Sequence, residues 1–459
     1  MWCRFYDHND IIPKIIIWNI NLSTKKLHLV SLGCTKNLVD SEIMLGRLQE
    51  YEISDDSENA DVIIVNTCGF IDAAKEESIN TILNLHEERK KNSLLVVSGC
   101  LTERYREELQ KDLPEVDIFT GVGDYEQIDK LIAAKKGTFS PEVYLANETA
   151  ERVITGSNTH AYIKIAEGCN QSCSFCAIPS FKGKLHSRTL LSIEKEVKAL
   201  VAKGFYEFSF ISQDSSSFGR DLKLKDGLID LIKTVETIEG VKIARILYLY
   251  PSTTTFELID TIADSSVFET YYDMPIQQID DGILKMMRRG FGEKKTIELL
   301  EHMKSKKDAF IRTSIIAGHP GESDEAFERV CDFMREFKFD RFNVFFYSNE
   351  ETTPAFTMKP VEEEVIEARI EVLEEIANET TTASLEAMLG KTITVILEGE
   401  SDEHEYILSA RPTLWAKDID GDILINDTSD LEIVYAALYE VKITELAGDR
   451  LLGTLIKAL

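Results

Sequence analysis

Residues 167–183 of the sequence read EGCNQSCSFCAIPSFKG, in which three and then two residues separate Cys169, Cys173 and Cys176. Thiolates on so short a loop can ligate three corners of an iron–sulfur cubane, because such clusters favour soft sulfur ligands. Three ligands leave one iron open to a substrate or cofactor. A zinc site or a set of redox thiols is the alternative, although structural zinc takes four protein ligands and only His186 lies nearby in the sequence.

The cysteine loop follows the first of six strand-like runs, and stretches with helical periodicity separate these runs. The six runs span residues 162–168, 208–213, 242–250, 270–276, 310–318 and 341–348. Six strand–helix units predict a partial form of the eight-unit α/β barrel, whose chemistry lies at the carboxyl ends of its strands. The opening left by the missing units would admit a large substrate.

Three more cysteines follow strand-like runs nearer the amino terminus. The runs at 27–33, 60–67 and 94–99 alternate with helical stretches, which predicts a parallel sheet with crossover connections. The next residue after each run is a cysteine, and open α/β sheets bind ligands at the carboxyl edge where these cysteines should gather. Buried structural thiols are the alternative, but three equivalent positions favour a shared site. The three residues are Cys34, Cys68 and Cys100.

The carboxy-terminal region changes periodicity twice. Residues 361–389 carry Ile366, Ile370 and Leu373 at helical spacing among glutamates, which predicts a connecting helix with a solvated acidic face. Residues 390–459 contain five short strand-like runs separated by turn residues, typical of a small β-barrel of the oligonucleotide-binding type. We therefore predict an α/β protein with an extension of no assigned function at 1–26, a parallel-sheet domain at 27–140, a partial barrel at 155–360, the connecting helix and the terminal β-barrel.

The composition limits the partners and the compartment. The 459 residues include 51 Lys and Arg against 80 Asp and Glu, and the formal net charge of −29 disfavours a nucleic-acid partner. Eight cysteines in so long a chain do not resemble a small disulfide scaffold, so we expect a reducing, cytoplasmic environment. No run approaches the roughly 18 apolar residues that a membrane span needs, so we expect no membrane partner. Cys3 in the extension and Cys331 on an apolar helix face are expected to have no chemical role.

The cysteine loop after the first barrel strand resembles that of the radical S-adenosylmethionine (SAM) superfamily. With SLGCTKNLVDSE (31–42), VNTCGFI (65–71), VSGCL (97–101) and the terminal β-barrel, the chain from residue 27 is similar to the methylthiotransferases. This resemblance implies two 4Fe-4S clusters, SAM as both methyl donor and radical source, and substrate recognition by the terminal domain, called TRAM. The implied ligands are Cys34, Cys68 and Cys100 for the sulfur-donor cluster and Cys169, Cys173 and Cys176 for the SAM-binding cluster.

Two branches of this family differ in substrate. Four local strings resemble the RimO branch, which places a methylthio group on the β-carbon of an aspartate in small-subunit ribosomal protein S twelve. The alternative is the MiaB branch, which modifies a tRNA adenosine. A non-enzymatic alternative is a zinc-stabilised binding protein. The RimO-like strings are Lys36-Asn37, Gly69-Phe70-Ile71, Ser212-Gln213-Asp214 and TPAF at 353–356.

The charge of the terminal domain supports the same branch. Residues 391–459 contain six basic and fourteen acidic residues. A barrel that binds tRNA phosphates should be basic, whereas an acidic one complements a basic ribosomal protein. These acids are alternatively a solubilising surface. The expected partners are ribosomal protein S twelve, whether free or within the assembled or assembling subunit, and a low-potential electron donor, with tRNA disfavoured.

The resemblance also suggests residues that contact SAM. Phe175 and Ile178 flank the last ligand of the SAM-binding loop, where they would press on the adenine and the loop. Arg312 would hold the SAM carboxylate by a bidentate pair, and Gln213 would meet its amino or ribose groups. The backbone at Gly318, within IIAGHPGE, would approach the adenosine. A structural role at the edge of the core is the alternative for Gln213 and Arg312.

Two residues depart from the RimO pattern. Thr35 follows Cys34 where the pattern usually has proline, a change that we expect the loop to tolerate. Gln278 ends DMPIQQ where RimO proteins usually carry histidine. Glutamine can form hydrogen bonds but does not titrate near neutral pH, so the sequence leaves the role of Gln278 open.

Overall fold

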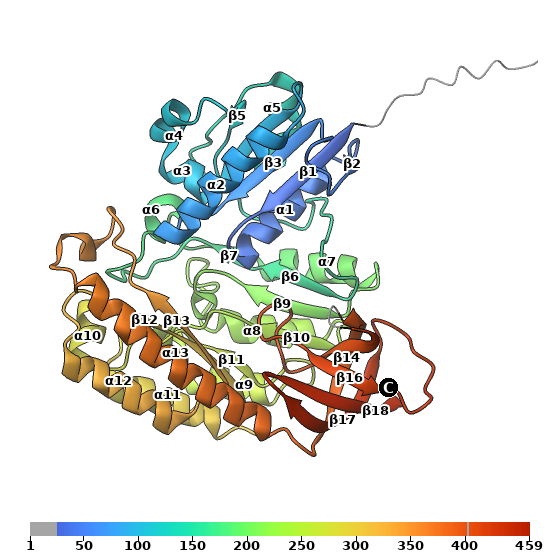
Figure 1. The fold of residues 1–459 in the computed structure, drawn as a ribbon, viewed down its shortest axis with the longest axis vertical. Helices are drawn as coiled ribbons and strands as arrows, with labels where there is room; N and C mark the ends of the chain where they lie inside the picture. The colour runs from blue at the N-terminus through green and yellow to red at the C-terminus, as the bar shows by residue number, and fades with distance from the viewer. Residues whose placement is uncertain (1–24, 402–403) are drawn as a thin grey trace, which may run out of the picture.

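The computed structural model describes residues 25–401 and 404–459, and the predicted extension lies outside the described residues apart from its last two. The chain forms a parallel-sheet domain, a partial α/β barrel and a closed β-barrel (Figure 1). Figure 1 places the first domain and the terminal barrel at opposite ends of the molecule, with the partial barrel between them. The predicted α/β fold class is confirmed.

The amino-terminal domain is a parallel sheet with strand order β2-β1-β3-β4-β5. The central strand β3 consists of VIIVNT, and every one of its residues is buried, as expected for a strand covered on both faces. The strands are β1 Lys26–Ser31, β2 Glu52–Ile53, β3 Val62–Thr67, β4 Leu94–Gly99 and β5 Ile118–Phe119, and the helices are α1 Thr35–Arg47, α2 Asp72–Glu88, α3 Cys100–Arg104, α4 Arg106–Asp112, the 3₁₀ helix η1 Tyr125–Gln127 and α5 Ile128–Ala134.

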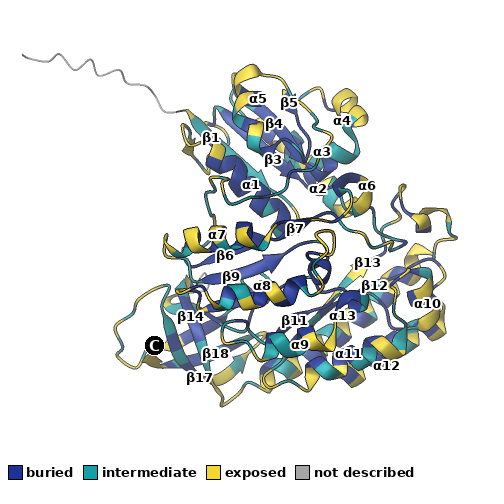
Figure 2. Ribbon diagram, turned by 180° about the vertical axis from the view of Figure 1, so that it is seen from behind, coloured by how far each residue is buried: buried dark blue, intermediate teal, exposed yellow. Residues whose placement is uncertain are grey.

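The partial barrel consists of two parallel three-stranded sheets, β10-β9-β6 and β11-β12-β13, joined by a parallel bridge between Ala244 and Phe268. Figure 2 shows the inner strands β6 and β9 buried behind helices whose outer faces are exposed, whereas β13 is partly exposed. The strands are β6 His160–Lys164, β9 Glu207–Ile211, β10 Ile243–Ile246, β11 Tyr271–Asp273, β12 Phe310–Ala317 and β13 Arg341–Phe346, with a small antiparallel pair β7 Ala166–Glu167 and β8 His186–Ser187. The helices are α6 Ile178–Lys182, α7 Leu190–Val201, η2 Ser215–Ser217, α8 Gly227–Glu236, η3 Pro251–Thr253, α9 Phe256–Ala263, α10 Asp281–Met286, α11 Glu293–Lys304, α12 Asp324–Phe337 and η4 Pro354–Thr357.

The barrel strands end earlier than the sequence predicts, and β10 and β11 show the reason. The run at 242–250 is extended only to Ile246, and the run at 270–276 only to Asp273. Tyr248 has a φ angle of 65°, and a left-handed residue cannot continue a strand. In the second run, Pro275 has no backbone N–H to donate to a neighbouring strand. These residues instead begin the loops at the carboxyl edge of the barrel.

The carboxy-terminal region consists of one long helix and a closed barrel. Helix α13, Glu363–Glu386, buries Ile366, Leu373 and Ile376 and contacts β13 and α12. The terminal barrel has the strand order β14-β15-β16-β18-β17. Its strands are β14 Thr392–Ser401, β15 His404–Pro412, β16 Ile423–Asp427, β17 Leu438–Ala447 and β18 Arg450–Ala458. The predicted five-stranded barrel is thus confirmed.

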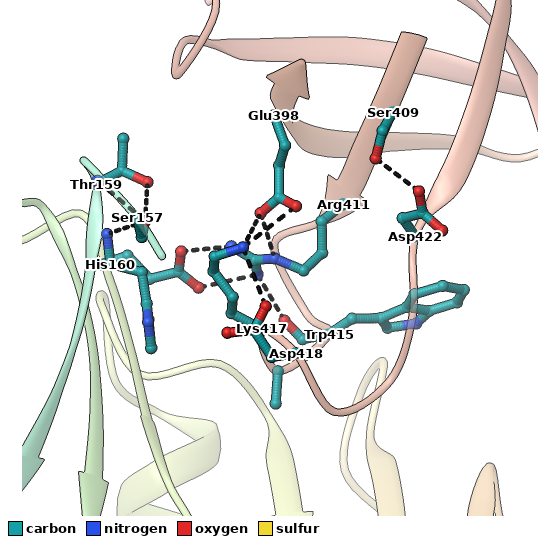
Figure 3. A network of polar contacts seen from close by, with 12 residues as sticks. Ser157, Thr159, His160, Glu398, Ser409, Arg411, Trp415, Lys417, Asp418 and Asp422 are labelled. Atoms are coloured by element: carbon teal, nitrogen blue, oxygen red, sulfur yellow. Dashed lines mark hydrogen bonds and ion pairs between the residues drawn. The ribbon is translucent and has the colours of Figure 1, made fainter. Parts of the chain in front are cut away.

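A buried ion-pair group joins the terminal barrel to the partial barrel. Arg411 of β15 donates to both carboxylate oxygens of Glu207 in β9, at 2.9 and 2.6 Å, and Arg245 of β10 pairs with the same carboxylate. Arg411 also donates to Glu398 and to the backbone oxygen of Trp415 at 2.9 and 2.7 Å (Figure 3). Arg245, Arg411 and Glu207 are almost completely buried, so neither guanidinium has water as a substitute partner.

Replacement of Glu207 by alanine should therefore destabilise the attachment of the terminal barrel. Removal of Glu207 leaves the buried Arg245 without its ion-pair partner and leaves Arg411 with Glu398 alone. Loss of one member of a buried ion pair costs about 3–5 kcal/mol. Urea unfolding followed by tryptophan fluorescence measures this loss. Glu194→Ala is the control, because Glu194 pairs with Lys198 on the helix surface and such a pair contributes about 0.5 kcal/mol. Equal stability of the two variants would contradict this account of the joint.

Candidate active site

All six cysteines singled out from the sequence line one cavity of about 440 Å³ between the amino-terminal domain and the partial barrel. Cys34, Cys68 and Cys100 come from the ends of β1, β3 and β4 in the first domain. The other three come from the loop after β7 in the barrel. The carboxyl edges of two separate parallel sheets therefore face the same space, although the two cysteine groups are far apart in the sequence.

The amino-terminal cysteine loops are held together by Asn37. Its amide nitrogen donates to the backbone oxygens of Leu32 and Thr67, at 3.1 and 2.9 Å, and its amide oxygen accepts from the Cys100 thiol at 3.6 Å. A single side chain thus connects the segments that carry all three cysteines. Asn37 belongs to one of the strings quoted above for its resemblance to the RimO branch.

Gly33 provides the space for Cys68. Its φ angle is +81°, in the region that favours glycine. A Cβ atom at this position would lie 2.6 Å from the Cβ and 2.8 Å from the Sγ of Cys68. The backbone of one cysteine loop therefore approaches the side chain of the next as closely as glycine permits.

The barrel cysteines lie on a tightly bonded loop. The backbone nitrogen of Cys169 donates to Gly183 at 3.1 Å, and that of Cys176 donates to Cys173 at 3.3 Å. The Cys173 sulfur lies 3.3 Å from Arg289 Nη1 and 3.5 Å from the Tyr250 hydroxyl. A cationic donor thus lies beside the middle cysteine of the trio.

Burial keeps most of these thiols protonated at neutral pH. It raises the pKa of Cys68 to about 11 and those of Cys169 and Cys176 to about 12, and it also raises the pKa of Cys100. Metals bind the thiolate rather than the thiol, so metal binding here must release protons. The first domain places a cation close by, because the Lys36 ammonium lies 3.4 Å from the centre of the Tyr248 ring at the cavity wall.

The chemistry of the donors suits iron–sulfur clusters, which favour soft thiolate ligands. In a cubane each cysteine binds its own iron, so the sulfur atoms need not converge on a point. The cavity is also predominantly apolar, with Phe70, Phe181 and Pro179 among its walls.

Four of the five residues predicted to contact SAM line this cavity, namely Phe175, Ile178, Gln213 and Arg312. Gln213 donates to Glu167, and Arg312 donates to Asp273 at 3.0 Å. Gly318 does not line the cavity. Its backbone nitrogen donates to Glu322, and its Cα faces Ile366 of α13.

Gln278, the departure noted in the sequence, is buried away from the cavity lining. Its amide donates to Glu322 at 3.0 Å, and its oxygen accepts from the backbone nitrogens of Ile279 and Asp280. Glu322 in turn pairs with Arg369 of α13. In this chain Gln278 therefore supports the loop between β12 and α12.

Comparisons with known proteins agree with this geometry. Residues 26–121 match Uncharacterized protein family UPF0004, residues 163–334 match the Radical SAM superfamily and residues 389–456 match the TRAM domain. The chain is 74% identical over 435 residues to ribosomal protein uS12 methylthiotransferase RimO of Sulfurovum sp. (strain NBC37-1), covering 95% of this chain and 99% of that protein. It is 64% identical to the protein of the same name from Aliarcobacter butzleri (strain RM4018), covering 94% and 98%.

The chain belongs to the RimO family of radical SAM methylthiotransferases. The predicted RimO branch is thereby confirmed, and the zinc-stabilised binding protein is excluded as an alternative. RimO family members are enzymes that use SAM and 4Fe-4S clusters, which agrees with the predicted cofactors. Among solved structures, the radical SAM methyltransferase TsrM from Kitasatospora setae shares the fold, with a TM-score of 0.52, 13% identity and coverage of 72% of this chain and 74% of that chain.

Sequence reasoning missed several charged residues of this RimO-family site. Arg289 contacts Cys173 but comes from MMRRG, where no pattern marks one arginine over the other. Lys182 lines the cavity, and its ammonium lies 3.6 Å from carboxylate oxygens of both Asp40 and Glu167. Burial disfavours its charge, but these carboxylates raise the pKa of Lys182 well above its usual value. Only the folded chain brings these groups together.

The described part of the chain contains no helix with the length and apolar composition that a membrane crossing requires.

Proposed function

We propose that the protein inserts a methylthio group at the β-carbon of an aspartate in ribosomal protein uS12. The observation that carries this proposal is the single cavity lined by both cysteine trios. A carbon radical must capture sulfur before it is quenched, so the two groups of ligands have to face the same substrate atom. High identity to uS12 methylthiotransferases supports the substrate.

The six cysteines fit two clusters, with Cys34, Cys68 and Cys100 holding the sulfur-donor cluster and Cys169, Cys173 and Cys176 the SAM-binding one. When bound, these clusters and SAM supply the electron transfer, the radical, the methyl group and the sulfur. The protein supplies position and exclusion of water. Sulfur donation is assigned to residues 27–140, radical generation to 155–360 and partner binding to 390–459.

The cavity residues have distinct tasks. Asp273 holds Nη1 of Arg312 at 3.0 Å, so the guanidinium is fixed at the cavity wall, where it can bind the SAM carboxylate. Gln213, oriented by Glu167, can bind the SAM amino or ribose groups. Phe175 and Ile178 form an apolar wall beside the adenosine.

The surface suits a basic protein partner. Phe345 and Phe346 at the end of β13 line the cavity and remain 43% and 42% exposed, which leaves apolar surface for a peptide loop. The terminal barrel lies at the far end of the molecule from the first domain (Figure 1), so its acidic surface would bind a part of the partner remote from the aspartate. The reaction needs a low-potential electron donor and belongs in the cytoplasm, where uS12 is free or within the small subunit.

Comparison of cells with and without this gene tests the substrate. Mass spectrometry of uS12 should show one methylthio group on an aspartate only when the gene is present, and tRNA should be identical in both strains. Complementation with a Cys173→Ala variant is the control and should leave uS12 unmodified. Loss of a tRNA modification with uS12 unchanged would refute the proposed substrate.

Cysteine replacement tests the cluster assignment. The protein reconstituted without oxygen should hold about eight irons per chain. Replacement of Cys169, Cys173 and Cys176 by alanine should remove about half of this iron and abolish SAM cleavage, whereas replacement of the amino-terminal trio should remove the other half and abolish only sulfur insertion. Cys331→Ala is the control, because Cys331 is buried in the barrel core. Loss of all iron from either triple variant would contradict two independent sites.

Gly33→Ala should act on the amino-terminal site alone. The added Cβ would meet Cys68 at 2.6 Å, so this thiol is displaced and about half of the iron should be lost while SAM cleavage remains. Gly156→Ala is the matched control, since Gly156 has a φ angle of +72° but no atom within 4 Å of the added Cβ. Iron content and SAM cleavage measure both variants. Full iron content in Gly33→Ala would show that the close approach does not shape the site.

A further inference from the structure

A loop of the terminal barrel enters the partial barrel from the end opposite the cysteines. This insertion loop, residues 413–422, connects β15 to β16. Its Trp415 is 2% exposed, and the ring centre lies 6.5 Å from that of Phe310, the first residue of β12. The guanidinium of Arg341, the first residue of β13, lies 4.9 Å from the Trp415 ring. The amino ends of the barrel strands therefore pack against a segment of the terminal domain.

Polar contacts hold the insertion loop in place. The Tyr162 hydroxyl of β6 donates to the backbone oxygen of Lys417 at 2.7 Å, and Arg245 donates to the backbone oxygen of Thr413. Figure 3 shows Trp415 and Lys417 in this loop, close to Arg411. The loop is thus anchored on several strands.

The innermost carboxylate of the insertion loop is Asp420. It is 7% exposed, and its Oδ2 accepts from the backbone nitrogen of Ala416 at 2.8 Å. Its Oδ1 has no hydrogen-bond partner among the described residues and lies 3.8 Å from Nε of Arg312. Arg312 also lines the cysteine cavity. Only the side chain of Arg312 therefore separates this residue of the terminal domain from the cysteine cavity.

Arg312 lies between two carboxylates. Asp273 of β11 binds its Nη1 at 3.0 Å, and Asp420 faces its Nε at 3.8 Å. Two anions at different nitrogens limit rotation of the planar guanidinium more than one can. The third nitrogen, Nη2, donates no hydrogen bond within the described part of the chain and is left for a ligand.

We propose that Asp420 is a positioning residue for the SAM site, because it fixes the guanidinium that binds the SAM carboxylate. This inference rests on the role of Arg312 given under the proposed function. The terminal domain is then part of the radical-generating core as well as a surface for the partner.

The test measures SAM binding to the reconstituted protein in the absence of uS12. In Asp420→Asn, which keeps the size of the side chain and removes its charge, the SAM dissociation constant by calorimetry and the KM for SAM cleavage should both rise about fivefold with kcat little changed. Asp418→Asn is the matched control, since Asp418 is an exposed acid of the same loop paired with Lys417. Unchanged SAM affinity in Asp420→Asn would overturn the proposal.

A double-mutant cycle separates positioning from a merely structural effect. Asp420→Asn should weaken SAM binding in the parent protein and have no further effect in an Arg312→Gln background. Additive effects would overturn the proposal. If Arg312→Gln alone leaves SAM affinity unchanged, the assigned role of Arg312 fails and the inference with it. Weaker SAM binding in Arg312→Gln together with unchanged binding in Asp420→Asn would refute this inference and leave the proposed function intact.

Fluorescence reports whether the insertion loop stays in place. The chain has three tryptophans, and replacement of Trp2 and Trp18 by phenylalanine leaves Trp415 as the reporter. We expect the same emission maximum with and without Asp420→Asn. A shift to longer wavelength with weaker SAM binding would mean that the loop had left the barrel, and would overturn a positioning role.

Discussion

The relative position of the two cysteine trios depends on a buried ion-pair group between the first domain and the barrel. Lys164 of β6 pairs with Asp40 of α1 and with Glu167 of β7, and Lys182 of α6 lies 3.6 Å from both carboxylates. Burial opposes the charge of Glu167, but the two lysines lower its pKa to about 2. Buried ion pairs add little net stability, but removal of one member is costly. The group therefore selects one arrangement of the two domains.

A second buried carboxylate, Glu350, joins the same two domains. Glu350 follows β13 of the barrel and binds Lys75 and Arg104 of the first domain, at 3.1 and 2.5 Å. Glu207 has the equivalent function at the opposite end of the barrel, where it binds Arg411 of the terminal domain. Both domain boundaries thus contain a buried anion of the barrel bound by cations of the neighbouring domain, and the Lys164–Asp40 pair adds the opposite polarity at the first boundary. Several acids of this acidic chain are therefore structural.

The sequence predicted those features of the molecule that depend on residues close together in the chain. The buried strands and the cysteines that follow them share one segment of chain, so their order placed both trios at sheet edges. Arg289, Lys182 and Glu350 are brought to their partners only by folding, and no spacing in the sequence marks them. The insertion loop falls among the turn residues between the predicted strands, and nothing in the sequence marks it, because its contacts lie in another domain.

The acidic residues in the buried ion pairs are not the ones that give the surface its negative charge. Asp40, Glu167 and Glu207 are buried beside lysine or arginine and have little effect on an approaching partner. The exposed face of α13, in contrast, carries unburied glutamates between its core-facing residues. The buried acids are balanced by buried cations and add little to the net charge. The formal charge of −29 therefore describes mainly the exposed surface that a partner meets. Under the proposed function, such a surface would repel the phosphates of tRNA and attract the basic uS12, and the exposed Phe345 and Phe346 would bind a loop of that protein.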